Sequence, residues 1–134
     1  MSSAHEPRVL LDSHAVLWSL SEPSRLGPKL RRLLDNPKFL PLVSTVSLWE
    51  ILAKAKAGKL HFAADPEASV KQHIQYLQAL TLPLRVEHVY AANRLPLLHK
   101  DPWDRLLIGQ AISEGALLAT KDEAIRNYEV GIIW

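Results

Sequence analysis

The chain has 134 residues, of which 48% are hydrophobic and 22% charged, which is the length and composition of a single globular domain. It contains no cysteine, so disulfides, thiolate zinc sites and thiol nucleophiles are excluded, and any metal ligand must be oxygen or imidazole. The formal net charge of +2 permits a nucleic-acid partner but is too small to indicate one.

The N-terminal residues contain no apolar stretch of signal-peptide length, and no segment approaches the roughly 20 apolar residues of a membrane span. We therefore expect a cytoplasmic protein with no membrane contact. The same composition predicts one domain over residues 1–134, with a core that begins at about residue 8 and a flexible terminal segment at 1–7.

The first half of the chain alternates short apolar runs with segments of helical spacing. The predicted strands lie at 9–11 and 39–44, and the predicted helices at 13–18, at 29–34 and from 45 onward. Pro41 weakens the second strand or places it at the edge of a sheet, since proline has no N–H to donate to a ladder. Gly58 is a plausible end for the helix that begins at residue 45.

The second half continues the alternation. The predicted helices lie at 67–80, 87–94 and 102–114, with a short one opening at 121–123, and the predicted strands at 82–84, 116–120 and 130–134. Asp101 precedes Pro102 in the pattern of a helix cap followed by the first helical position, and Gly115 ends that helix. Alternating strands and helices predict an α/β fold with a mostly parallel central sheet and helices on both faces.

Four acidic residues, far apart in sequence, occupy positions where this fold could gather them. Asp12 and Asp122 follow apolar strands, and ligands of open α/β sheets bind beyond the carboxyl ends of the strands. Asp104 lies in the first turn of a predicted helix and Glu50 on a helix face. Four neighbouring carboxylates repel one another unless a hard divalent cation such as Mg²⁺ or Mn²⁺ lies between them, so the pattern indicates a carboxylate cage for such an ion.

Each of these acids also has a structural interpretation. Asp12 and Asp122 could cap the helices that follow them, and Asp104 could interact with a helix dipole. Glu50 could pair with Lys54 one turn later. Taken singly, the structural interpretations are favoured, and only the joint placement of the acids argues for a metal site.

The other chemistry-bearing residues form no motif of known spacing. The histidines have no HExxH or other zinc spacing, although His14 and His99 could line a cleft near the acids. The chain has neither a glycine-rich phosphate loop nor a GxSxG nucleophile motif. The four tryptophans lie within helical or strand patterns, which favours core or interface positions over base stacking.

Four sequence blocks nevertheless combine into a specific pattern: VLLDSHA (9–15), VSTVSLWEI (43–51), HKDPWDRLL (99–107) and LATKD (118–122). In their order, spacing and composition they resemble the PIN-domain ribonucleases, and within these the VapC-type toxins of toxin-antitoxin pairs. The resemblance extends from Val9 to the final GIIW segment. Two positions depart from the subgroup: Ser13 stands where threonine is common, and Lys121 where a small residue is common.

The resemblance implies a Mg²⁺- or Mn²⁺-dependent endoribonuclease of PIN-like fold that is usually homodimeric and inhibited by a cognate VapB-type antitoxin. It further implies that RNA is cleaved to 5′-phosphate and 3′-hydroxyl ends. The acids Asp12, Glu50, Asp104 and Asp122 match the catalytic and metal-binding quartet of the family. Supporting roles match Ser44, Thr120 and Asp101, the last of these as a helix cap rather than a ligand.

Basic residues near these blocks are candidates for contacts with RNA phosphates, or are simply solvated or ion-paired surface charges. They are Lys54, Lys100, Arg105 and Lys121. Two other functions remain open at this stage. One is a Mg²⁺-dependent phosphoryl-transfer or receiver-like domain, which the segment Asp12-Ser13-His14 fits poorly. The other is a catalytically idle binding module of the same fold, which the intact acids disfavour.

Overall fold

In the computed structural model, which describes residues 8–99 and 101–134, five strands form one sheet with the order β3-β2-β1-β4-β5. Every neighbouring pair of strands is parallel. The strands are β1 (Val9–Leu11), β2 (Leu42–Ser44), β3 (Leu80–Leu82), β4 (Leu117–Ala119) and β5 (Ile132–Ile133). The predicted α/β class with a parallel central sheet is confirmed.

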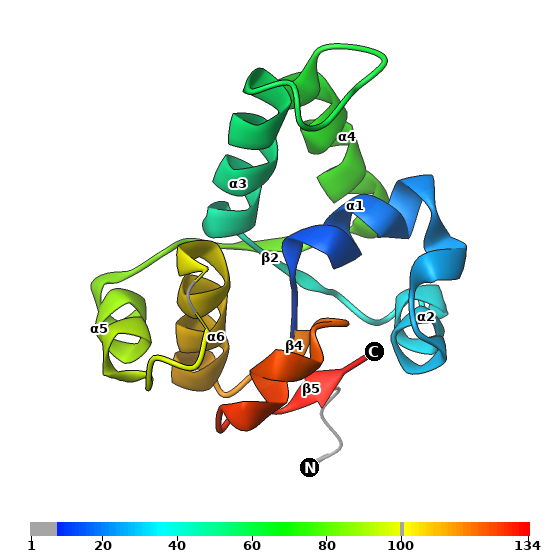
Figure 1. The fold of residues 1–134 in the computed structure, drawn as a ribbon. Helices are drawn as coiled ribbons and strands as arrows, with labels where there is room; N and C mark the ends of the chain where they lie inside the picture. The colour runs from blue at the N-terminus through cyan, green and yellow to red at the C-terminus, as the bar shows by residue number, and fades with distance from the viewer. Residues whose placement is uncertain (1–7, 100) are drawn as a thin grey trace.

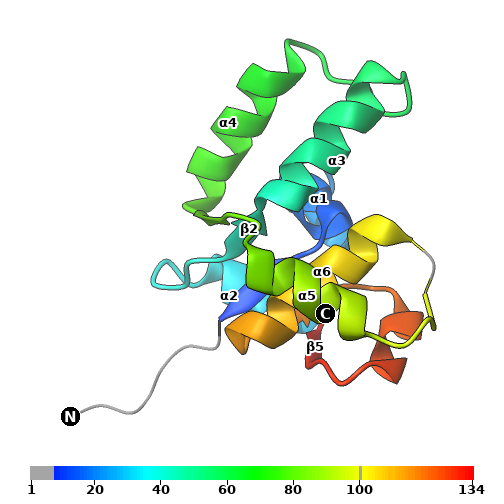
Figure 2. The same cartoon turned by 90° about the vertical axis from the view of Figure 1, so that its left-hand side faces the viewer.

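Six α-helices and two short 3₁₀-helices connect the strands within the described part of the chain. They are α1 (Ser13–Ser21), η1 (Pro23–Arg25), α2 (Pro28–Asp35), α3 (Thr45–Lys56), α4 (Pro66–Leu77), α5 (Val86–Arg94), α6 (Pro102–Glu114) and η2 (Glu123–Asn127). Figures 1 and 2 show that α3 and α4 lie side by side and extend away from the sheet, while α5 and α6 form a second pair. None of the described helices is long and apolar enough to cross a bilayer.

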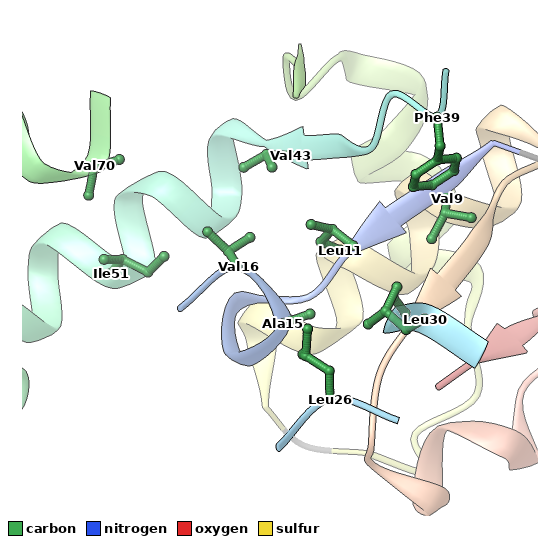
Figure 3. Close-up of a cluster of buried hydrophobic side chains, with 11 residues drawn as sticks. Val9, Leu11, Ala15, Val16, Leu26, Leu30, Phe39, Val43, Ile51 and Val70 are labelled. Atoms are coloured by element: carbon green, nitrogen blue, oxygen red, sulfur yellow. The ribbon is translucent and has the colours of Figure 1, made fainter. Parts of the chain in front are cut away.

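The central strand β1 is buried on both faces, because its successive side chains point to opposite sides of the sheet. Val9 and Leu11 face the cluster of Figure 3. There, α1, α2, α3 and α4 contribute apolar side chains, among them Leu30 and Ile51. Burying one such side chain stabilises the fold by about 1.5–3 kcal/mol.

The opposite face of the sheet packs against α6, and Leu10 is the residue of β1 that points to it. Leu107 and Ile108 of α6 are almost fully buried there, together with Leu118 of β4. Helices thus cover both faces of the sheet, and both clusters meet at β1. This burial fixes the position of the carboxyl end of β1, where Asp12 lies.

Two of the predicted strands differ from the structure in position. The predicted helix at 67–80 ends earlier, at Leu77, because Gln78 adopts a left-handed conformation with φ of 52°. The strand that follows is therefore Leu80–Leu82 rather than 82–84, and it ends before Pro83, which has no N–H for the ladder. Likewise β2 begins after Pro41, so the proline lies outside the strand, and the alternative of an edge position is wrong because β2 lies between β3 and β1.

The sequence signals around α6 are confirmed in detail. The Asp101 carboxylate accepts hydrogen bonds from the backbone N–H groups of Trp103 and Asp104, at 2.8 and 3.2 Å. Pro102 is the first helical residue, and Gly115 ends the helix with a φ of 64°. The helix start is thereby fixed, which places the first-turn residue Asp104 at the same edge of the sheet as Asp12.

Candidate metal centre

The four predicted acids line a single cleft of about 280 Å³ at the carboxyl edge of the sheet. Asp12 follows β1 directly, and Asp122 comes three residues after β4, the neighbour of β1. Asp104 comes from the first turn of α6, and Glu50 from the middle of α3. Parallel pairing of β1 with β4 explains the meeting, because the carboxyl ends of parallel strands lie at one edge.

Asp12 is held in place by the helix that it caps. Its Oδ1 accepts a hydrogen bond of 2.7 Å from the backbone N–H of Ala15, and its own N–H donates to the carbonyl of Ala119 at 3.0 Å. Burial raises the pKa of this carboxyl, while hydrogen bonds from Ala15 and from the hydroxyl of Thr120 lower it in part. The capping role and a place in the acidic cleft are therefore compatible in the same residue.

Glu50 is buried, with 6% of its surface exposed, and both of its oxygens are engaged. Oε1 accepts a hydrogen bond of 2.6 Å from the hydroxyl of Ser13, and Oε2 one of 2.6 Å from Nζ of Lys54. The Lys54 side chain is 40% exposed, so its contribution to stability is below about 1 kcal/mol. These two partners fix the direction of the Glu50 carboxylate within the cleft.

The pKa of Asp104 is raised by burial and by the acids around it. Burial raises its pKa to about 6, and the carboxylate of Asp101 is the next largest cause of the increase. Glu50 and Asp12 raise the pKa further, whereas His99 lowers it. A carboxyl group that resists ionisation in this way is stabilised by any cation that enters the cleft.

His99 bridges Asp104 and Asp122. Its Nε2 lies 3.1 Å from Oδ2 of Asp104 and 3.0 Å from Oδ2 of Asp122. Its Nδ1 accepts the backbone N–H of Asp101 at 3.2 Å, so the ring proton of the neutral imidazole is on Nε2 and points to the two carboxylates. The backbone N–H of His99 donates to the hydroxyl of Tyr128 at 2.7 Å, which fixes the loop that carries the ring.

Asp122 caps η2 and is linked to Asp12 through Thr120. Its Oδ1 accepts the N–H of Ala124 at 2.9 Å, and its own N–H donates to Oγ1 of Thr120 at 3.1 Å. The Thr120 hydroxyl can then donate to Asp12, because an oxygen that accepts one hydrogen bond still has its own proton. Thr120 is thus a cleft residue, as the sequence led us to expect.

The other residues singled out from the sequence lie in different places. Ser44 is fully buried and is not part of the cleft wall, because its hydroxyl donates to Gln110 and caps α3 by accepting from Val46. Asp101 lines the cleft while capping α6. Lys54 and Lys121 lie on the cleft wall.

Arg105 does not face the cleft. Its guanidinium donates to the backbone carbonyls of Ala92, Leu95 and Pro96, at 2.9 to 3.2 Å, and so ties the end of α5 to α6. Lys100 lies outside the described residues.

Two of the four tryptophans, which the sequence predicts to be core or interface residues, also have surface in the cleft or open to solvent. Trp18 packs against the apolar cluster but also lines the cleft, and Trp49 is 61% exposed on α3. The hydroxyl of Ser13, too, has a place in the site that the sequence did not reveal, as the partner of Glu50. For Trp18 the available signal was its spacing from His14, since residues four apart share a helix face.

The donor set fits a hard divalent cation. The carboxylates of Asp12, Glu50, Asp104 and Asp122 line the same cleft, and oxygens of Asp104 and Asp122 lie within 4.8 Å of one another and of a ring nitrogen of His99. Oxygen-rich sites of this kind suit Mg²⁺ and Mn²⁺, which keep several waters and bind through a few carboxylates. Burial is the largest cause of the raised pKa values of Asp12 and Asp104, and neighbouring carboxylates raise both further.

Comparison with known proteins agrees with this architecture. The family model of the PIN domain matches residues 9–131. The chain is 29% identical over 121 residues to Ribonuclease VapC22 of Mycobacterium tuberculosis H37Rv, and the match covers 90% of this chain and 91% of the relative.

Two crystal structures of VapBC complexes share the fold. DNA-bound VapBC of Salmonella typhimurium has a TM-score of 0.70 at 13% identity and covers 96% of this chain and 98% of the other. VapBC2 of Rickettsia felis, bound to a DNA fragment from its promoter, has a TM-score of 0.68 at 12% identity, with coverages of 93% and 96%. At these identities the structures establish similarity of fold, and the family follows from the match over residues 9–131: the chain belongs to the PIN domain family.

Proposed function

We propose that this protein is a Mg²⁺- or Mn²⁺-dependent endoribonuclease, the toxin of a VapBC-type toxin-antitoxin pair. The observation that carries the proposal is the convergence of Asp12, Glu50, Asp104 and Asp122 on one cleft in a PIN-domain chain. The similarity of this chain to a protein named as a ribonuclease, over nine-tenths of both chains, supports RNA cleavage as the reaction.

A divalent cation bound here would polarise the scissile phosphate and lower the pKa of a coordinated water. We propose Asp12 and Asp104 as direct ligands. Burial and neighbouring acids raise the pKa of both carboxyl groups, and a bound cation would stabilise their ionised forms. Glu50 and Asp122 complete the quartet, directly or through water.

The residues around the acids hold them in position. Ser13 and Lys54 orient Glu50, Thr120 connects Asp12 with the backbone of Asp122, and His99 donates toward Asp104 and Asp122. Such orientation of ligands by a second layer of hydrogen bonds is worth about 10- to 100-fold in metal affinity or activity. These contacts set the directions of the carboxylates within the cleft.

Lys54 and Lys121 are the basic residues that we propose for contacts with RNA phosphates, since both line the cleft. Lys54 already pairs with one oxygen of Glu50, so we propose Lys121 as the stronger of the two phosphate contacts. Arg105 is left out of this set because its guanidinium is occupied by carbonyls of α5 and of the segment after it. Lys100 remains a candidate from the sequence alone.

We further propose a VapB-type antitoxin as the partner of this chain and a homodimer as its assembly. The structural similarity to toxins in VapBC complexes supports the first of these. Light scattering of the purified chain measures the assembly. Addition of a VapB-type protein encoded beside the gene should form a stable complex and suppress RNA cleavage.

The reaction is tested by incubating antitoxin-free protein with cellular RNA in Mg²⁺ or Mn²⁺. Cleavage should disappear with EDTA and fall at least about 100-fold in Asp12→Asn and in Asp104→Asn, which keep the size of the side chain but remove its charge. Glu67→Gln, an exposed change in the pair with Lys71 on α4, is the matched control and should cleave normally. Unchanged cleavage in both aspartate variants, or activity that resists EDTA, would contradict the assignment.

A further inference from the structure

An aromatic surface lies beside the four acids on α1. His14 and Trp18 are four residues apart, so they share one face of the helix, and both line the cleft. Their ring centroids are 5.1 Å apart and the ring planes are inclined by 33°. Trp134 contacts the indole edge-on at a centroid distance of 6.1 Å, which fixes the orientation of Trp18.

This aromatic surface is surrounded by positive charge. The guanidinium carbon of Arg25 lies 3.9 Å from the ring centroid of Trp18, and Nζ of Lys121 lies 5.6 Å from it. Both distances allow cation–π attraction. The Arg25 side chain is 47% exposed, and its ion pair with Glu22 is long, at 3.5 Å. The guanidinium, which lies against the face of the indole, and the exposed ammonium can therefore reach a ligand without breaking a buried ion pair.

Core packing explains only part of this arrangement. Trp18 is half-buried and contacts the apolar cluster, as a packing role requires. His14, however, is exposed at the first turn of the helix and extends the aromatic surface into the cleft. Aromatic rings combined with cations along a groove are the usual means of binding single-stranded nucleic acid, because any base can stack and any phosphate can pair.

We propose that His14 and Trp18 stack on an unpaired nucleobase of the RNA substrate, while Lys121 and Arg25 contact the phosphates that flank this base. The proposal rests on the proposed ribonuclease function and adds a contact with a base to it. Such a contact needs a base whose face is not already covered by its neighbours in an RNA helix.

The test separates contacts to bases from contacts to the backbone. Binding is measured by fluorescence anisotropy in the Asp104→Asn background, which leaves RNA intact, with a labelled 12-nucleotide oligoadenylate and with an abasic ribose-phosphate strand of equal length. Each variant is made in this background: His14→Ala, Trp18→Leu and, as a matched control, Trp49→Ala, whose exposed indole is not part of the cleft wall.

We expect the background protein to bind oligoadenylate more tightly than the abasic strand. His14→Ala and Trp18→Leu should each weaken oligoadenylate binding about 10-fold, since a base–aromatic stack is worth roughly 5- to 100-fold. Their affinity for the abasic strand should change less than about 2-fold, and Trp49→Ala should change neither affinity. Because His14 is exposed, its variant should fold even if Trp18→Leu does not.

Equal losses for the two strands, or no loss in His14→Ala, would overturn the stacking proposal. So would a background protein with no preference for the strand that carries bases. Cleavage of cellular RNA by the unaltered protein is measured in parallel. If that cleavage occurs while the stacking contrast fails, the ribonuclease assignment survives and only the aromatic surface is wrong; if no cleavage occurs, the proposed function itself fails.

Discussion

The molecule contains two polar clusters made of the same kinds of residue, and they differ in how completely their charges are compensated. In the first cluster, which we call the buried polar chain, each side chain is hydrogen-bonded to the next. Its members are Arg8, Glu114, His88, Gln110 and Ser44. In the acidic cleft, the carboxylates outnumber the cations, and Asp12 and Asp104 resist ionisation.

The shift in pKa reports this difference directly. His88 and then Arg8 donate hydrogen bonds to Glu114 and hold the pKa of its carboxyl below the usual range. Burial beside other acids moves the pKa of Asp104 in the opposite direction, to about 6. A compensated cluster stabilises the fold, whereas an uncompensated one is maintained by the rest of the fold and is available for a ligand.

The largest expected effect on stability lies in the buried polar chain. His88 is fully buried, with Nδ1 accepting from the N–H of Arg85 at 2.9 Å and Nε2 lying 2.8 Å from Oε2 of Glu114. His88→Ala leaves a cavity and unpaired partners, so we expect a loss of about 3 kcal/mol in the free energy of unfolding. Urea denaturation measures it.

An exposed histidine, His61, supplies the control, and His61→Ala should change stability by less than about 0.5 kcal/mol. The contrast between the clusters would break down if His88→Ala lost less than 1 kcal/mol, or if it abolished the stabilisation of the protein by Mg²⁺.

In the acidic cleft, removal of a charge should raise the free energy of unfolding instead of lowering it. Asp104→Asn removes a charge that is repelled by its neighbours while keeping an oxygen that accepts from His99, so the metal-free protein should gain about 1–2 kcal/mol at pH 7. The variant should also lose most of the thermal stabilisation by Mg²⁺ that a ligand of the folded state produces. Thermal unfolding with EDTA and with Mg²⁺ measures both.

Glu114→Gln is the matched change in the compensated cluster, and it should cost about 1 kcal/mol because it weakens the hydrogen bonds from His88 and Arg8. If both carboxylate-to-amide changes shift stability in the same direction, compensation does not distinguish the two clusters.

The gain in stability from Asp104→Asn should depend on pH. The folded protein binds a proton at Asp104 more tightly than the unfolded chain does, so this residue lowers stability as pH rises from about 4 to about 6. Without metal, the difference in stability between the variant and the unaltered protein should be small at pH 4, grow to pH 6 and then level off. A difference that is constant from pH 4 to pH 7 would place the effect outside the titration of Asp104.

The smallest effect is expected at the exposed end of the buried polar chain. Arg8 is 50% exposed and lies 3.2 Å from Oε1 of Glu114. Arg8→Ala should therefore cost less than about 1 kcal/mol, and high salt should reduce this cost further. Urea denaturation at two salt concentrations checks it; a loss comparable with that of His88→Ala would mean that the ion pair, and not the buried histidine, anchors the chain.

Local signals in the sequence were sufficient for most of the helices and strands. The apolar run before Asp12 and the Asp101–Pro102 helix start depend on neighbouring residues only, and both appear in the structure as predicted. The strand near Leu82 begins and ends earlier in the chain than the sequence predicted. Its position depends on pairing with β2 and on the left-handed residue Gln78, and neither feature leaves a periodic pattern in the sequence.

The α/β alternation, the helix caps and the sequence blocks that predict one site for four acids can be read from the amino-acid sequence, because they depend on short-range preferences and on residue type. The neighbours that each acid meets became known only from the folded structure. It assigned Ser13 and Lys54 to Glu50, placed the His99 ring between Asp104 and Asp122, and turned Arg105 away from the cleft. These outcomes depend on parallel strand pairing and helix packing, which bring residues together from distant parts of the chain and thereby set their charge, burial and reach.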